Sequence, residues 1–212
     1  MATRGSSFSV ESALSYGWNA TKNNLGFFIL LFLVVWVIEL ILYFLRGELG
    51  RNAPFVGFLF GLIVFLVGLF IQMNLIGIAL RVYDNHQPRL EELFTVPPHW
   101  ISFLIAGIIY GLAVGIGLLL FIIPGLYIAV RWLFYGYAVV DRNAEATQAL
   151  GISWELTKRH ILELFLLLVV LFFLNVIGAI LLGVGLLITV PISLMATTYA
   201  YRMLQAPVAG GV

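Results

Sequence analysis

The sequence predicts an all-α protein, a polytopic helical membrane bundle of six transmembrane helices with interfacial amphipathic helices. Three observations predict this fold class. The chain of 212 residues is 62% hydrophobic and only 10% charged, whereas a soluble domain is roughly 25% charged, so its apolar surface exceeds what a soluble core can bury. Six apolar runs have about the length of a membrane span. An amphipathic phrase occurs twice, each time just before such a run.

The expected spans belong to a single integral membrane domain, residues 1–212. The second is long enough to tilt, the fourth is short and opens at Pro124, which suits a first helical turn, and the sixth contains Pro191, which predicts a kink. The links "IIPG" and "GVG" are so short that spans three and four, and five and six, should form tight antiparallel hairpins. The six spans cover about residues 26–45, 55–80, 100–122, 124–140, 161–182 and 186–204.

The repeated phrase reads "ALSYGWNATK" at residues 13–22 and "ALGISWELTK" at 149–158, an offset of 136 (149 − 13). As a helix, each copy gathers apolar and small side chains on one stripe and polar ones on the other. This pattern predicts amphipathic helices on the membrane surface, over about residues 9–24 and 144–159. Ser9 and Asn143 are the expected N-terminal caps.

Four side chains of the two copies are predicted to be interfacial anchors. Trp18 and Trp154 should lie at headgroup depth, and Lys22 and Lys158 should meet anionic lipid. A degenerate third helix is expected in "QPRLEELF", over about residues 87–95. The chain therefore reads as three repeats of a surface helix plus a transmembrane hairpin, which is either the scaffold of a transporter or only the trace of gene duplication.

Cations in the short loops predict the orientation, because cytoplasmic loops are enriched in Lys and Arg. The opposite side holds only Arg46 and Arg51. Both termini are therefore expected in the cytoplasm, and the protein in the cell membrane. The eight cations on the predicted cytoplasmic side are Arg4, Lys22, Arg81, Arg89, Arg142, Lys158, Arg159 and Arg202.

Three stretches resemble a known family: "FSVESALSYGWNATKNNLGFF", "IIPGLYIAVRWLFYGYAVVDRNAEATQALGISWELTKRH" and "GLLITVPISLMATTYAYR". They are similar to an uncharacterised bacterial family of six-helix integral membrane proteins. That family is in turn similar to the membrane domain of glycerophosphodiester phosphodiesterases. The resemblance implies a fold and a setting in the bacterial inner membrane, and it implies no activity, because the catalytic barrel of those enzymes has no counterpart here.

No constellation for catalysis is found, so we expect a protein that is not an enzyme and has no cofactor. There are no cysteines, no phosphate-binding loop, and no histidine pair at helical spacing for a metal or haem. A net charge of +1 argues against a nucleic-acid partner. The expected function is a non-enzymatic module that organises membrane lipids or protein partners in a larger membrane complex. The alternative is a transporter or permease for a small or amphipathic substrate.

Three polar residues inside the spans share one predicted depth. Glu39, Arg131 and Asn175 each lie about 9–10 Å below the outer end of a span, at a rise of about 1.5 Å per residue. Since an intramembrane arginine seeks an acceptor, we predict a cluster in which Arg131 pairs with Glu39 and Asn175 completes the hydrogen bonds. The cluster either locks helix packing or forms a site for a headgroup or substrate. Gln72 and Asn74 should form a separate patch nearer the cytoplasm.

Overall fold

The computed structural model describes residues 8–181 and 183–205, and within them it contains helices and turns and no strand. The predicted all-helical class is thus confirmed. The helices are α1 (Val10–Asn23), α2 (Leu25–Asn52), α3 (Pro54–Tyr83), the 3-10 helix η1 (Leu90–Phe94), α4 (Trp100–Leu120), α5 (Ile122–Arg131), α6 (Tyr135–Arg142), α7 (Ala146–Thr157), α8 (Ile161–Ile180) and α9 (Leu186–Gln205).

Five stretches of the described chain are long and apolar enough to cross a membrane. They are α2, α3, α4, the α5–α6 pair taken together, and α8. The 20-residue helix α9, which is the predicted sixth span, is not among them; its sequence includes several Thr, Ser and Tyr residues. It continues through Pro191 without interruption. The predicted end of the fifth span, at residue 182, and the predicted loop cation Arg4 lie outside the described residues.

The predicted fourth span, 124–140, is broken in the structure. Helix α5 ends at Arg131 and α6 begins at Tyr135. The break is held by hydroxyl groups of α7, because Ser153 accepts a hydrogen bond from the Phe134 N–H (3.0 Å) and donates one to the Arg131 carbonyl (3.0 Å). Thr157 donates to the same carbonyl at 3.1 Å. Side chains of another helix therefore satisfy backbone groups that a continuous helix would pair internally.

Of the two N-terminal caps that the sequence predicts for the surface helices, the structure has one. Ser9 caps α1 as expected, accepting the Ser12 N–H at 3.1 Å. The prediction that Asn143 caps α7 is wrong: Asn143 has φ 51° and ends α6, and Glu145 caps α7 in a capping box with Gln148. A left-handed residue is a common helix terminator, and Asn tolerates it.

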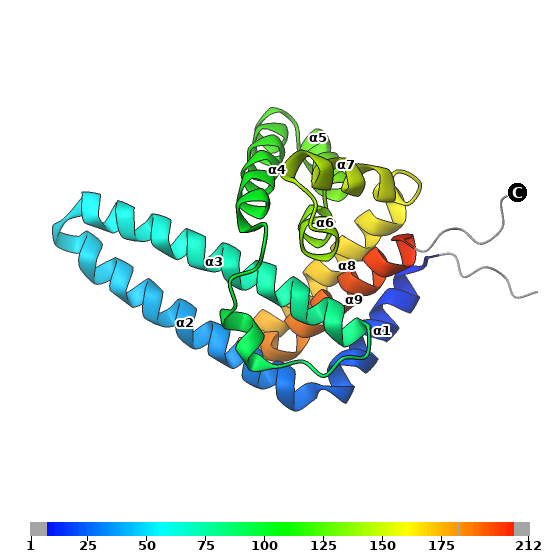
Figure 1. The fold of residues 1–212 in the computed structure, drawn as a ribbon, viewed down its shortest axis with the longest axis horizontal. Helices are drawn as coiled ribbons and strands as arrows, with labels where there is room; N and C mark the ends of the chain where they lie inside the picture. The colour runs from blue at the N-terminus through cyan, green and yellow to red at the C-terminus, as the bar shows by residue number, and fades with distance from the viewer. Residues whose placement is uncertain (1–7, 182, 206–212) are drawn as a thin grey trace, which may run out of the picture.

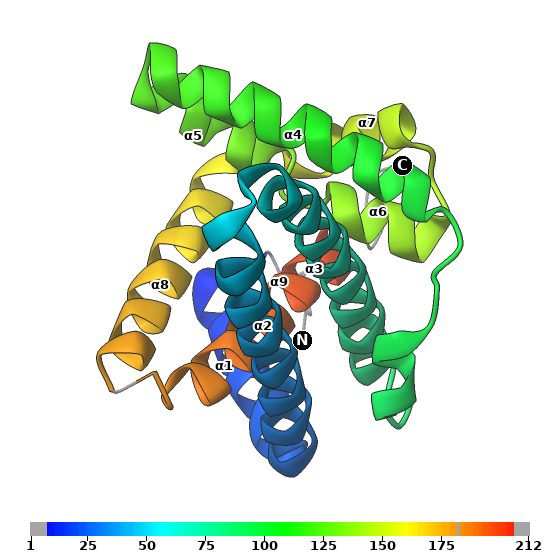
Figure 2. The same ribbon diagram turned by 90° about the vertical axis from the view of Figure 1, so that its left-hand side faces the viewer.

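The helices form three hairpins, α2–α3, α4–α5 and α8–α9, which point in different directions (Figures 1 and 2). The α2–α3 hairpin extends away from the rest of the molecule, while α4 and α5 lie side by side and run steeply across it (Figure 1). Large apolar side chains are exposed over all three, up to 87% for Leu119 and 79% for Ile123 near the α4–α5 turn. Such surfaces are suited to lipid.

A glycine pair brings the two helices of every hairpin into close contact near the turn. A Cβ on Gly57 would lie 2.6 Å from the Cα of Gly50. The α4–α5 and α8–α9 hairpins repeat this approach, since a Cβ on Gly117 would lie 2.8 Å from Cα of Gly125, and one on Gly185 would lie 2.8 Å from Cα of Gly178. Small residues let the backbones of membrane helices meet at this distance.

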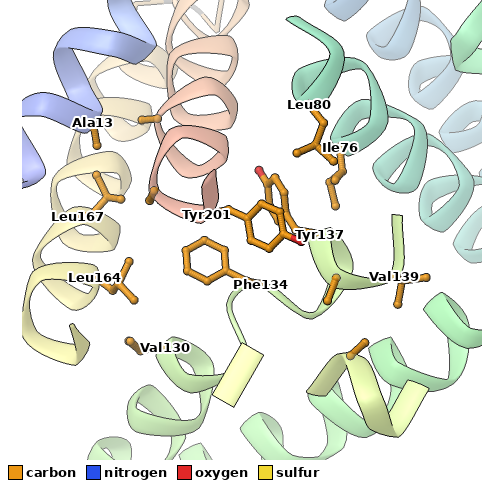
Figure 3. Packing of buried hydrophobic residues seen from close by; sticks show 14 of the residues in the cluster. Ala13, Ile76, Leu80, Val130, Phe134, Tyr137, Val139, Leu164, Leu167 and Tyr201 are labelled. Atoms are coloured by element: carbon orange, nitrogen blue, oxygen red, sulfur yellow. The ribbon is translucent and has the colours of Figure 1, made fainter. Parts of the chain in front are cut away.

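The core lies where the inner ends of the hairpins meet the short helices. Figure 3 shows the rings of Phe134, Tyr137 and Tyr201 grouped between side chains of α3, α6, α8 and α9. Helix α1 packs along α9, and a Cβ on Gly17 would lie 2.6 Å from the Ile192 carbonyl oxygen. The face of α1 that carries Gly17 is therefore buried against protein.

Replacing Gly185 by alanine should destabilise the protein by about 1–3 kcal/mol, because the new methyl group meets backbone atoms that cannot shift independently. Gly111→Ala on α4 is the matched control, since its Cβ would meet nothing within 4 Å. The control should be neutral or slightly stabilising. Thermal unfolding in mild detergent compares the two variants, and equal midpoints would contradict the role of the glycine pair.

Candidate functional site

The predicted cluster of Glu39, Arg131 and Asn175 is not formed, because each side chain has other surroundings. Arg131 is only 2% exposed, and its guanidinium carbon lies 3.9 Å from the centre of the Trp154 ring. Its Nη1 donates to the Thr157 hydroxyl at 3.4 Å. No ion pair of Arg131 is found among the described residues.

The physical substitute for a carboxylate at Arg131 is an aromatic ring. A guanidinium over the face of an indole is attracted by the ring quadrupole, by about 2 kcal/mol or more when both are desolvated. Tyr127 adds a second ring at 5.9 Å. The Nε of Arg131 has no hydrogen-bond partner in the described part of the chain, so the ring contacts and one long hydrogen bond hold a buried cation.

Asn175 stabilises the α8–α9 hairpin. Its amide nitrogen donates to the Ser193 hydroxyl at 2.8 Å and to the Leu171 carbonyl at 2.9 Å. Ser193 in turn donates to the Thr189 carbonyl at 2.8 Å. Asn175 therefore joins two helices as a polar contact of the kind that membrane helices use in packing.

Gln72 and Asn74 do not form the single patch that was predicted. Gln72 is exposed, whereas Asn74 is 7% exposed and donates to the Leu93 carbonyl at 2.8 Å and to the Thr95 carbonyl at 3.0 Å. An ion pair of 3.2 Å between Arg81 and Glu92 fixes the same loop. Asn74 thus ties η1 to the side of α3.

The four predicted anchors fall into two kinds. Trp18 is 53% exposed on α1, and Lys22 is exposed one turn later. Lys158 is also exposed, at 3.9 Å from Glu155. Trp154 differs, because its ring covers Arg131. Contact with lipid stays a prediction for all four.

A network that the sequence analysis missed joins the ends of three helices. Arg202 on α9 forms ion pairs with Asp84, at the end of α3 (2.6 Å), and with Asp141, at the end of α6 (2.9 Å). Asp141 also accepts hydrogen bonds from the Tyr201 hydroxyl (3.1 Å) and the Gln205 amide (3.0 Å). The side chains of Arg202 and Asp141 are only 19% and 17% exposed. We call these residues the Arg202 network.

A tyrosine group places α1 next to the Arg202 network. Tyr16 of α1 stacks on Tyr199 at 5.0 Å between ring centres and contacts Tyr83 at 5.2 Å. Burial, followed by the electrostatic effects of Tyr83, Asp84 and Tyr199, raises the pKa of Tyr16 to about 12. The phenol is therefore neutral at physiological pH, and it packs as an aromatic side chain.

The sequence carried one signal for this network. Asp84, Asp141 and Arg202 each stand at the end of an even-numbered predicted span, on the side that the cation distribution assigns to the cytoplasm. Charges at one end of adjacent helices are candidates for pairing. Depth alone did not show which of the many loop charges lie side by side.

An open groove of about 640 Å³ lies beside α2 and α3. Its walls are apolar apart from a few side chains, among which Glu39 and Arg46 carry charge. Glu39 and Arg46 are exposed and have no ion-pair partner among the described residues. The groove is lined by Leu33, Trp36, Val37, Glu39, Leu40, Leu42, Tyr43, Arg46, Val64, Val67, Gly68 and Ile71.

Comparison with known proteins gives one match. The family described as "Domain of unknown function (DUF7847)" matches residues 100–211. Neither the curated proteins nor the solved structures that were compared contain a match. The similarity to phosphodiesterase membrane domains therefore has no support from these comparisons.

Replacing Arg202 by glutamine should cost about 2–3 kcal/mol of stability, mainly because the carboxylate of Asp141, which is only 17% exposed, loses its counter-charge; Asp84, which is 41% exposed, should contribute less. Arg51→Gln is the control, since the Arg51–Glu48 pair is 70% and 68% exposed and should contribute less than about 0.5 kcal/mol. Denaturant unfolding in mild detergent measures both. Equal effects would show that the Arg202 network is only a surface ion pair.

Replacing each of the two tryptophans of the repeated phrase by leucine should change the stability of the protein by different amounts. Trp154→Leu should cost about 2 kcal/mol or more through the loss of the contact with Arg131, whereas Trp18→Leu should change stability by less than about 0.5 kcal/mol. The same unfolding assay applies. Similar losses for both variants would contradict a special role for the Arg131–Trp154 contact.

Proposed function

Because the chain belongs to the DUF7847 family, whose description assigns no activity, we propose its function from its geometry: a non-enzymatic integral membrane module. It organises membrane lipids or protein partners, as a subunit of a larger membrane complex. The single observation that carries the proposal is the way in which polar side chains inside the fold are used. Those that form hydrogen bonds bind the backbones and side chains of neighbouring segments, whereas the buried hydroxyls of Thr21 and Thr189 have no partner among the described residues.

Three of these polar contacts support the proposal. Asn74 donates hydrogen bonds to two carbonyls of the loop beside it. Ser153 and Thr157 donate hydrogen bonds to the carbonyl of Arg131, and Asn175 donates one to the Ser193 hydroxyl. Aliphatic and aromatic side chains make up the core between α3, α6, α8 and α9 (Figure 3). A transporter needs a polar, water-filled cavity near the midplane, and polar groups engaged as packing contacts serve a different purpose.

The alternative function, transport of a small or amphipathic substrate, draws on the groove beside α2 and α3. Its two charges, Glu39 and Arg46, could accept a polar group. The groove lies against one hairpin and its lining is mostly apolar. A laterally open apolar groove favours a partner within the membrane over an aqueous substrate.

We also propose that the chain crosses the membrane six times, with both termini in the cytoplasm. The Arg202 network supports an even number of crossings between its members, because it joins the ends of α3, α6 and α9. These are the ends of the second, fourth and sixth expected spans. The glycine pair shared by the three hairpins supports an origin in three repeats. The bacterial inner membrane as location, and the likeness to the membrane domain of phosphodiesterases, are parts of the same proposal.

Single cysteines in this cysteine-free chain test both the proposed topology and the proposal that the interior contains no water-filled cavity. In sealed vesicles, Ser15→Cys should react with an impermeant thiol reagent from the cytoplasmic side, and Ala53→Cys from the other side. Ser153→Cys, whose parent side chain is fully buried, should stay unlabelled from both sides even with a small permeant, water-soluble reagent.

Each outcome bears on a different part of the proposal. Labelling of Ser15→Cys and Ala53→Cys from the same side would contradict the six-span topology. Fast labelling of Ser153→Cys at a rate near that of Ser15→Cys would indicate a water-filled interior, and the transporter would then be the better reading. Unfolding temperatures of the three variants confirm that each is folded before labelling.

A further inference from the structure

We propose that the groove beside α2 and α3 is the docking site for a transmembrane helix of another protein, one that carries a basic residue opposite Glu39. This inference rests on the proposed function and names the class of partner that the module would organise. It depends on the depth of two charges, on the apolar walls between them, and on the position of the hairpin in the fold.

Glu39 and Arg46 lie on one stripe of α2. They are seven residues apart, which is close to two helical turns, so they face the same direction about 10 Å apart along the helix axis. Helix α2 has 28 residues and, at about 42 Å, is longer than the hydrocarbon core of about 30 Å. If the helix enters the core at Leu25, Arg46 reaches the outer boundary and Glu39 lies about 10 Å inside it.

The two charges do not satisfy each other. No ion pair joins them, and Arg46 extends over α3, where a Cβ on Gly61 would lie 3.5 Å from its Nε. Glu39 is left exposed among apolar neighbours at a depth where a charged side chain is costly. The occupant of the groove must therefore bring a positive charge or a hydrogen-bond donor to that depth.

This requirement selects among the possible occupants. A phospholipid could place its phosphate on Arg46, but at the depth of Glu39 it offers only hydrocarbon. A second copy of this chain in the same orientation would place one Glu39 against another. A transmembrane helix with Lys, Arg or His at the level of Glu39 supplies the missing charge, and its apolar face fits the walls of the groove.

The surroundings of the groove suit a helix as occupant. The α2–α3 hairpin extends away from the other helices (Figure 1), so a partner can approach it within the membrane plane. Figure 2, which views the hairpin from its turn, shows α4 and α5 above it. Helix α4 meets α3 at Leu66, Leu69 and Phe70, none of which lines the groove. Gly68 in the lining has nothing within 4 Å of its Cβ position, which lets a second backbone come close.

A designed single-span helix of leucine and alanine tests the proposal. It is co-expressed with the full chain, oriented by basic residues on its cytoplasmic flank, and carries one lysine about 10 Å below its outer end. A leucine replaces the lysine in the matched probe. Each probe also carries one cysteine at the depth of residue 40. Oxidation with copper phenanthroline joins this thiol to Leu40→Cys, which lines the groove, and so reports docking. Ile41→Cys is the control, because its exposure is similar (55% and 53%) and it lies outside the lining.

The expected result is a cross-link at Leu40→Cys that is about tenfold stronger with the lysine probe than with the leucine probe, and weak at Ile41→Cys with both. Glu39→Gln should abolish the preference, while Glu163→Gln on α8 should leave it unchanged. Glu39→Lys should reverse it, so that a probe with glutamate docks best. This reversal also shows that the variant chain is folded.

Equal docking of the lysine and leucine probes, or a preference that survives Glu39→Gln, would overturn the proposal. So would phospholipid that co-purifies with the chain, is lost in Arg46→Gln and is unchanged in Glu39→Gln, without any preference among probes, because the groove would then be a lipid site. Any of these results leaves the module itself in place. Only a water-filled interior, measured by the Ser153→Cys variant, argues against that wider function.

Discussion

The ion pairs of Arg202 with Asp84 and Asp141 are the constraint that joins the separate parts of this fold. Each hairpin is a local unit, closed near its turn by two glycines, and the hairpins meet one another in a shared apolar core. Arg202 adds specific polar contacts at one side of this core, because it holds the ends of α3, α6 and α9 together. The stacking of Tyr16 on Tyr199 then adds α1 to the same end. Ion pairs are suited to orienting helices in a membrane, because apolar side chains are about as stable against lipid as against another helix.

The repeated amphipathic phrase has a structural explanation in both copies. The positions buried in both copies are Ala13, Gly17 and Thr21 in α1, and Ala149, Ser153 and Thr157 in α7. These small residues, spaced at four, allow close packing, which is a different role from the surface anchoring that the tryptophans suggested. The two copies share the threonine but differ in the contact that its hydroxyl makes. Thr157 donates a hydrogen bond to the Arg131 carbonyl, whereas the buried hydroxyl of Thr21 has no hydrogen-bond partner among the residues that the structure describes.

Much of the fold could be predicted from apolar length, because a span must match the hydrocarbon thickness. Most expected helices therefore start within a few residues of the observed ones. The break after Arg131 could not be predicted in this way, since it depends on hydroxyl groups of α7 that arrive from a distant part of the sequence. The pairing of Arg131 with Glu39 failed for a related reason. Depth gives the position of a residue along the membrane normal, and it does not tell which helices are neighbours or which way a side chain faces.

The contact of Arg131 with α7 has a consequence for biosynthesis. Arg131 enters the membrane at the end of α5, a helix of only 10 residues, and Thr157 follows 26 residues later in the chain. At about 5–20 residues per second, the ribosome needs about 1–5 s to complete that interval. During this time the guanidinium has only the ring of Tyr127 nearby, and it lacks the Trp154 ring and the Thr157 hydroxyl. Full burial of the charge at the end of α5 therefore requires that α7 has been synthesised.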